Sequence, residues 1–174
     1  LCAKPSTAQG SASKSRVSFS VRDFGASGDG ASKDTVAIQR AIDACTAAGG
    51  GVVTCPAGTY LIGTIFLKDN VELRLEAGAT LLGSPDRADY SALFDRPQMA
   101  LGFNYDHHLV CARRAQRIAI TGLGTIDGNG RAFFGPSPAG RRTFSIPGGW
   151  RPGMMLTFIE CQDVLLRDVH LIDS

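Results

Sequence analysis

Hydrophobic and polar residues first alternate regularly in residues 17–21, Val-Ser-Phe-Ser-Val. A period of two predicts a half-buried β-strand. The next segment, residues 25–30, contains glycine at every second or third position and predicts turns. The chain is therefore expected to open with a short strand followed by an irregular segment.

A helical pattern follows directly, because apolar residues recur at i, i+3, i+4 and i+7 on one face. These residues are Ile38, Ala41, Ile42 and Cys45. Asp34 is the predicted N-cap of this helix. The glycines at 49–51 are expected to end it.

Beyond the helix the pattern changes to short runs of Val, Ile and Leu separated by Gly, Asp and Asn, which predict short strands. A unit of three such strands occurs three times. The copies are 64–67, 71–75 and 80–82; 108–111, 118–120 and 125–127; and 155–158, 164–166 and 170–172. Val71, Ile118 and Val164 hold the same place in each copy and lie 47 and 46 residues apart. A fixed period of this length indicates a solenoid.

The two inserts in this repeat, residues 84–106 and 130–153, fall at the same place, between the third strand of one unit and the first strand of the next. Three strands per turn with loops leaving from one corner predict an all-β fold, a right-handed parallel β-helix. The predicted helix would cap its N-terminal end and cover its unpaired edge. An antiparallel sandwich is the rival architecture, but it predicts hairpin turns and no fixed repeat.

Residues 4–16 are rich in Ser, Ala and Lys and have no apolar period, so residues 1–16 are expected to form a flexible leader or signal-peptide remnant. Residues 17–174 are expected to form the N-terminal part of a β-helix domain, truncated before the catalytic turns. Charge is nearly balanced, with 18 basic and 16 acidic residues, which argues against a nucleic-acid partner. No apolar run is long enough to cross a bilayer. We expect a monomer that is secreted or periplasmic, or attached to the cell surface.

The five cysteines form no CxxC pair and stand beside no histidine at metal-ligand spacing, so no metal site is expected. They are interpreted as small buried hydrophobic residues. A disulfide between Cys45 and Cys55 remains an alternative.

Several segments resemble the polygalacturonases, a glycoside hydrolase family of the pectate-lyase-like superfamily. The matching segments are residues 19–26, 49–60, 120–130 and 151–164. The first two are shared by many β-helix proteins and indicate the fold. The Ile126-Asp127-Gly128 stretch, followed by the Arg151-Pro152 turn, is more particular to the hydrolases.

The resemblance implies a parent enzyme that hydrolyses α-1,4 linkages in pectin or galacturonan with inversion, without a metal or organic cofactor. The family's catalytic motifs, Asn-Thr-Asp, Asp-Asp, His-Gly and Arg-Ile-Lys, lie later than the segment matching residues 171–174, and none occurs here. We therefore expect no catalytic residue in this chain, and no activity from it alone. A calcium-dependent polysaccharide lyase of the same fold and a non-catalytic β-helix adhesin or tailspike domain are the alternatives.

Trp150 and Arg151 are the predicted substrate-binding residues, because an aromatic face stacks on a sugar ring and a guanidinium pairs with a uronate carboxylate. Acidic residues near the strands are interpreted as turn residues that bind backbone amides: Asp69, Asp127, Asp163 and Asp173. The segment Asp106-His107-His108 is interpreted as the exposed end of a loop.

Overall fold

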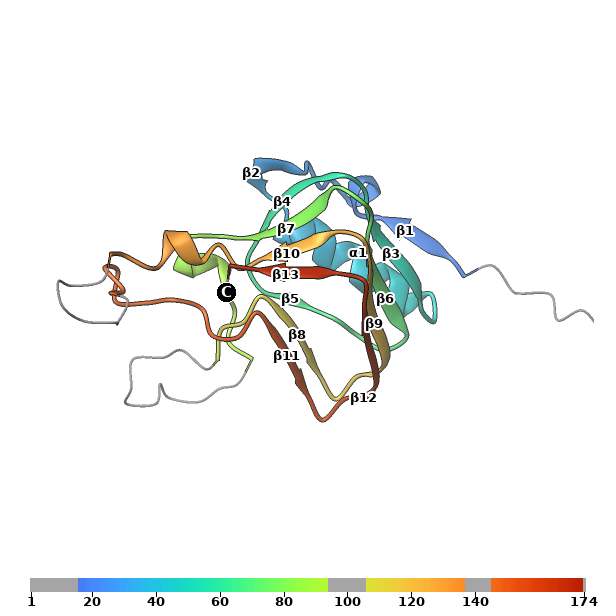
Figure 1. Cartoon of the computed structure of the whole chain (residues 1–174). Coiled ribbons are helices and arrows are strands. Elements are labelled where there is room, and N and C mark those ends of the chain that lie inside the picture. Colours follow the sequence, from blue (N-terminus) through green and yellow to red (C-terminus); the bar gives the residue numbers. More distant parts are fainter. Residues whose placement is uncertain (1–15, 94–105, 137–144, 174) are drawn as a thin grey trace, which may run out of the picture.

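Three parallel sheets form the three sides of a coil in the computed structural model, which describes residues 16–93, 106–136 and 145–173 (Figure 1). The first sheet holds β1 (Ser18–Ser20), β3 (Gly51–Cys55), β6 (Val71–Leu75), β9 (Gln116–Gly122) and β12 (Gln162–Arg167). The second holds β2 (Asp29–Lys33), β4 (Gly58–Ile62), β7 (Ala79–Gly83), β10 (Thr125–Asp127) and β13 (His170–Ile172). The third holds β5 (Ile65–Phe66), β8 (Val110–Arg113) and β11 (Leu156–Ile159).

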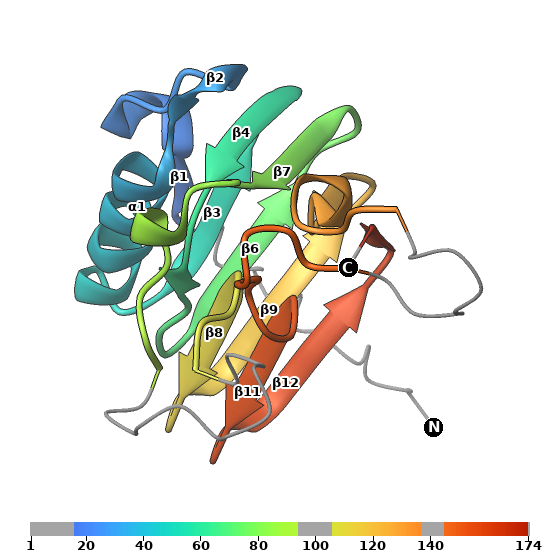
Figure 2. The same cartoon turned by 90° about the vertical axis from the view of Figure 1, so that its left-hand side faces the viewer.

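Every named strand pair is parallel, so the antiparallel sandwich is excluded and the right-handed parallel β-helix is confirmed. The predicted repeat is also confirmed at the level of register. Val164 pairs with Ile118, and Leu73 on the preceding coil pairs with Ile120. Figure 2 shows the coils stacked from the helix at one end to β11, β12 and β13 at the other.

Aliphatic side chains in matching register form rows through the interior. Tyr60, Leu81 and Ile126 make one such row, and all three are fully buried. Burying a large apolar side chain stabilises the fold by about 1.5–3 kcal/mol. The stacked rows therefore supply the core that a single coil could not.

The helix α1 (Thr35–Ala47) covers the N-terminal end of the coil and contacts β1, β3, β5 and β6. Its apolar face is buried as the helical period predicts: Ala37, Ile38, Ala41, Ile42 and Cys45. This confirms the capping helix. The part of the chain that the structure describes contains no helix long and apolar enough to span a membrane.

Asp34 takes the N-cap position of α1, but its side chain makes no capping hydrogen bond. Its carboxylate instead accepts from the backbone amides of Ser27 (2.7 Å) and Gly28 (3.0 Å). The predicted N-cap position is therefore confirmed, but the predicted capping hydrogen bond is absent. The buried carboxylate instead binds the backbone of the glycine-rich segment before β2. That segment also leads into β2, a strand that the turn prediction did not include.

The cysteines in the described residues are all free thiols: Cys45, Cys55 and Cys111 are buried, and Cys161 is half-buried. The interpretation as small hydrophobic residues is confirmed for the three buried ones, and no disulfide joins Cys45 to Cys55. Burial raises the pKa of the Cys111 thiol to about 12, so this thiol is protonated at neutral pH.

Residues 1–15 of the predicted leader lie outside the described residues. Arg16 belongs to the folded part, since its guanidinium pairs with Glu72 on β6 at 2.5 Å. Three short 3₁₀ helices complete the secondary structure of the described residues: η1 (Val21–Phe24), η2 (Arg87–Asp89) and η3 (Gly130–Ala132). The helices η2 and η3 open the two inserts, which leave from the same corner of the coil (Figure 1).

Candidate substrate-binding site

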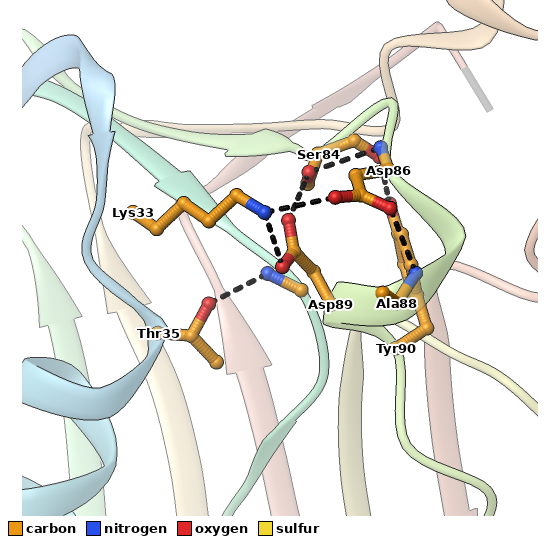
Figure 3. Close-up of polar contacts among 8 residues, drawn as sticks. Lys33, Thr35, Ser84, Asp86, Ala88, Asp89 and Tyr90 are labelled. Atoms are coloured by element: carbon orange, nitrogen blue, oxygen red, sulfur yellow. Dashed lines mark hydrogen bonds and ion pairs between the residues drawn. The ribbon is translucent and has the colours of Figure 1, made fainter.

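The first insert is fixed to the N-terminal coil by Lys33, at the end of β2 (Figure 3). Its ammonium donates to Asp86 Oδ2 at 2.9 Å and to Asp89 Oδ1 at 2.7 Å. The second oxygen of Asp89 accepts from the Ser84 hydroxyl at 2.5 Å. These two carboxylates raise the pKa of Lys33, Asp89 having the larger effect. We call Lys33, Ser84, Asp86 and Asp89 the lysine clamp.

Asp86 also starts η2, because its carboxylate accepts from the Ala88 amide at 2.9 Å. This backbone hydrogen bond, and then the Lys33 ammonium, lower the pKa of Asp86. Asp86 is therefore ionised at neutral pH. A general acid for glycoside hydrolysis needs a raised pKa, so Asp86 is a poor candidate for that role.

A close backbone approach fixes the first insert at a second point. The Thr64 amide donates to the Asp89 carbonyl at 3.2 Å, and a Cβ on Gly63 would collide with that same oxygen. The Thr64 hydroxyl donates to the carbonyl of His108 at 2.6 Å. The two ends of the insert are therefore tied to the same short stretch of the preceding coil.

Trp150, from the second insert, lies at the centre of an aromatic cluster that joins the two inserts. Its ring centroid is 5.3 Å from Tyr90, 5.8 Å from Phe133 and 6.1 Å from His107. The Arg87 guanidinium lies 5.7 Å from the same ring, a cation–π distance. Trp150 is 9% exposed, so most of its surface packs against protein.

The lysine clamp and the aromatic cluster are connected through η2. Tyr90 follows η2 directly and donates its hydroxyl to the Ser84 carbonyl at 2.9 Å. Burial raises the pKa of Tyr90, which keeps the phenol protonated as a donor. Lys33 therefore holds the turn that places Arg87 and Tyr90 against Trp150.

Within the part of the chain that the structure describes, two pockets adjoin this cluster. The larger has a volume of about 440 Å³ and is lined by both inserts: Pro85, Arg87, Arg131, Ala132, Phe133, Phe134, Pro147, Gly148 and Trp150. We call it the insert pocket. Its volume falls within the range of about 300–1,000 Å³ that is usual for small-ligand sites.

The smaller pocket has a volume of about 20 Å³ and is lined by Arg151 together with Tyr90, Phe133, Phe134 and Met155, among others. This volume admits a water molecule but no sugar ring. The structure thus places the two predicted substrate-binding residues differently. Trp150 lines the insert pocket, whereas Arg151 lines the smaller one and lies 5.5 Å from the Phe134 ring.

Three of the four acidic residues near the strands, Asp69, Asp127 and Asp173, accept hydrogen bonds from backbone amides, as the turn interpretation predicts, whereas Asp163 lies inside a strand. Asp69 accepts from the Gln116 amide at 2.9 Å, and Asp127 accepts from the Asn129 amide at 2.8 Å. Asp163 lies within β12 and Asp173 follows β13, both with positive φ. Within residues 16–93, 106–136 and 145–173, no group of His, Cys, Asp and Glu side chains could hold a metal ion.

The interpretation of residues 106–108 as an exposed loop end is wrong for His108, which is 2% exposed. Its ring accepts from the Met154 amide at Nδ1 (3.1 Å), so it joins β8 to the end of the second insert. His107 is half-buried against Trp150. Its own burial, and then the charge of Arg87, lower the pKa of its imidazole.

Sequence reasoning missed Arg87, Arg131 and the Phe133-Phe134 pair as pocket residues. Inserts have no hydrophobic period, so spacing gives no information about which of their side chains meet. The adjacent aromatics beside Arg131 were the one available signal, since two neighbouring Phe residues in a loop are rarely both left in water.

Stacked three-strand coils with a helical cap and long inserts at one corner define a pectate-lyase-like β-helix protein. Residues 18–122 match the family described as "Rhamnogalacturonase A/epimerase, pectate lyase-like". The chain belongs to this family.

The chain is similar to the exo-poly-α-D-galacturonosidase of Dickeya chrysanthemi, with 39% identity over 120 residues, which is 64% of this chain and 19% of that protein. It is also similar to the mannuronan C5-epimerase AlgE3 of Azotobacter vinelandii, with 54% identity over 63 residues, 32% of this chain and 3% of that protein. The solved family 28 exopolygalacturonase of Yersinia enterocolitica superposes with a TM-score of 0.69 and 28% identity, covering 91% of this chain and 35% of that one. The resemblance to polygalacturonases is thus confirmed, and the chain spans about a fifth to a third of these galacturonan-cleaving relatives.

Proposed function

We propose that the parent protein is a glycoside hydrolase that cleaves a galacturonan-type polysaccharide in pectin by inversion. The observation that carries this proposal is the similarity to an exo-poly-α-D-galacturonosidase over 64% of the chain. Inversion requires a carboxylic acid and a carboxylate base about 6.5–9.5 Å apart. The acidic residues described above, Asp69, Asp86, Asp89 and Asp127, bind backbone amides or Lys33, so the proposal assigns that pair to coils outside this chain.

The proposed role of this chain is to begin the substrate groove with its two inserts. Both inserts directly precede strands of the third sheet, β8 and β11, and both contribute to the insert pocket. We assign substrate contact to Trp150, which lines the insert pocket, and to Arg151, whose guanidinium lies 5.5 Å from the ring of Phe134, another residue of that pocket.

A second candidate is a lyase or epimerase acting on an acidic polysaccharide. The 54% identity to a mannuronan C5-epimerase favours it locally, although over 63 residues only. The proposed hydrolase rests on the longer match.

The test uses the full-length gene product with polygalacturonate and, separately, with alginate, each with and without a calcium chelator. A hydrolase should release new reducing ends from polygalacturonate, even with the chelator present, and its products should not absorb in the ultraviolet. Products that absorb in the ultraviolet would instead indicate a lyase. A change in uronate stereochemistry without cleavage, followed by NMR, would indicate an epimerase, and either result overturns the hydrolase proposal.

The proposal includes a location outside the cytoplasm, secreted or periplasmic or at the cell surface, because pectin is an extracellular polymer. It also includes a monomeric state. Fractionation of cells expressing the full-length gene tests the location, and light scattering of the purified protein tests the monomer. Cytoplasmic retention or a stable dimer would contradict these two parts.

A further inference from the structure

The insert pocket has a cationic lining that contains no acidic residue. Arg87 comes from the first insert and Arg131 from the second, and no acidic residue is among the residues that line the pocket. Two arginines brought together from separate loops repel one another unless an anion lies between them. The lining therefore favours a negatively charged occupant.

Arg87 lines this pocket without an acidic partner from its own turn. The neighbouring acids, Asp86 and Asp89, are both bound to Lys33, as Figure 3 shows. Arg87 itself forms no ion pair within the part of the chain that the structure describes, and its guanidinium is held near the Trp150 ring at 5.7 Å. A guanidinium held beside an aromatic ring in this way keeps N–H groups in its own plane that can donate to a carboxylate.

Arg131 is the more accessible of the two arginines. Its side chain is 94% exposed, and its one ion pair, with Asp173, is long at 3.9 Å. An exposed pair of this length contributes little stability, so it competes weakly with a ligand. Arg131 can therefore turn toward an anion in the pocket at little cost.

The remaining walls are apolar and suit a sugar ring. Phe133, Phe134, Pro147 and Trp150 contribute aromatic and proline surface around the two guanidinium groups. Carbohydrate C–H faces pack on such surfaces, while polar groups at the rim fix the orientation. Inorganic anions would use the arginines but not these walls.

We propose that the insert pocket binds a uronate ring, with its carboxylate held by Arg87 and Arg131 and its C–H face against Phe133 and Phe134. The inference rests on the proposed function in that the uronate belongs to the polysaccharide on which the parent enzyme acts. A carboxylate is preferred over a sulfate ester because its two coplanar oxygens match the guanidinium fork.

The test is calorimetric binding of three ligands to the full-length protein: digalacturonate, its methyl ester, and a sulfated galactose disaccharide. Arg87→Gln and Arg131→Gln are each expected to weaken digalacturonate binding about 10-fold, since each removes a charge-assisted hydrogen bond. Affinity for the neutral ester should be low and unchanged by either variant. Arg40→Gln on the exposed face of α1 is the matched control and should bind as the unchanged protein does.

Arg131→Gln decides the outcome even where Arg87→Gln fails to fold, because the Arg131 side chain is almost fully exposed. Equal affinity of the Arg131 variant and the unchanged protein for digalacturonate would overturn the proposal, as would tighter binding of the sulfated ligand. Because binding and cleavage are measured in separate assays, a protein that binds digalacturonate through these arginines but cleaves no galacturonan would refute the proposed hydrolase alone. If the full-length protein cleaves galacturonan but both arginine variants bind digalacturonate as tightly as the unchanged protein does, the pocket proposal alone would be refuted.

Discussion

Leu171 on β13 pairs in register with Ile126 on β10, yet Ile126 is fully buried and Leu171 is 45% exposed. The same contrast appears in the first sheet, where Leu166 pairs with Ile120 but is 44% exposed while Ile120 is 1% exposed. Each row is therefore closed at the α1 end and open at the β12–β13 end. The core of this chain is asymmetric along the solenoid axis.

This asymmetry predicts different costs for equivalent substitutions in the isolated 174-residue chain. Leu73 and Leu166 occupy the same row, separated by one coil. Leu73→Ala should lower the free energy of unfolding by about 2–5 kcal/mol, because it leaves a cavity in a closed core. Leu166→Ala should change it by about 0.5 kcal/mol, as a surface substitution does. Urea denaturation measures both, and equal losses would contradict the open row.

The repeat could be predicted because aliphatic rows are periodic, and Val71, Ile118 and Val164 carry that period in the sequence. β2 could not, since Asp29–Lys33 contains no apolar alternation and is a strand through pairing with β4 alone. The insert pocket depends on contacts between Arg87 and Trp150 that tertiary packing creates. Sequence spacing therefore predicts the repeating coils. It does not predict the insert pocket, which exists only once the two inserts are folded against each other.

Glu72 on β6 makes a buried ionic network that predicts acid sensitivity. Its carboxylate accepts from the Thr121 hydroxyl at 2.7 Å and from Arg74 Nη2 at 2.6 Å, and Arg16 pairs with its second oxygen. Burial opposes ionisation, but these three partners outweigh it and lower the pKa of Glu72. The sheet face between β6 and β9 thus depends on an ionised carboxylate.

A lowered folded-state pKa contributes stability above the unfolded pKa, near 4.5 for Glu, that is lost as pH falls through the folded value. Glu72→Gln should therefore lower the free energy of unfolding by about 1–3 kcal/mol at pH 7, with a smaller difference from the unchanged protein below the folded pKa. Urea denaturation across acid pH measures this convergence. Glu160→Gln is the control, since Glu160 makes an exposed pair with Arg114 and should have little effect. A difference for Glu72→Gln that does not change with pH would contradict the ionic role.

Gly63 tests whether its close approach to the Asp89 backbone positions the first insert. A Cβ at this position would meet the Asp89 carbonyl, so Gly63→Ala must displace the turn that carries Arg87. We expect a stability loss of about 1–3 kcal/mol and weaker uronate binding. Gly148→Ala is the matched control for stability, because a Cβ there meets nothing within 4 Å. Thermal unfolding and calorimetry report the two effects, and unchanged behaviour of Gly63→Ala would show that the insert is not fixed at this point.

Trp150 combines a packing role with a proposed contact to substrate, and two substitutions separate these roles. Trp150→Ala removes the centre of the aromatic cluster and should lower the free energy of unfolding by about 3–5 kcal/mol. Trp150→Phe keeps a ring against Tyr90 and Phe133, so its cost should be smaller, while the edge that lines the insert pocket is lost.

The proposed contact therefore predicts that Trp150→Phe raises the KM for galacturonan in the full-length enzyme. This increase should be larger than the accompanying drop in melting temperature would explain. Phe24→Leu is the control, because Phe24 is an aromatic residue beside Phe19 that lies outside both pockets. It should lower stability with an unchanged KM. A Trp150→Phe enzyme with an unchanged KM would assign Trp150 to packing alone and leave the arginines as the groups that recognise the ligand.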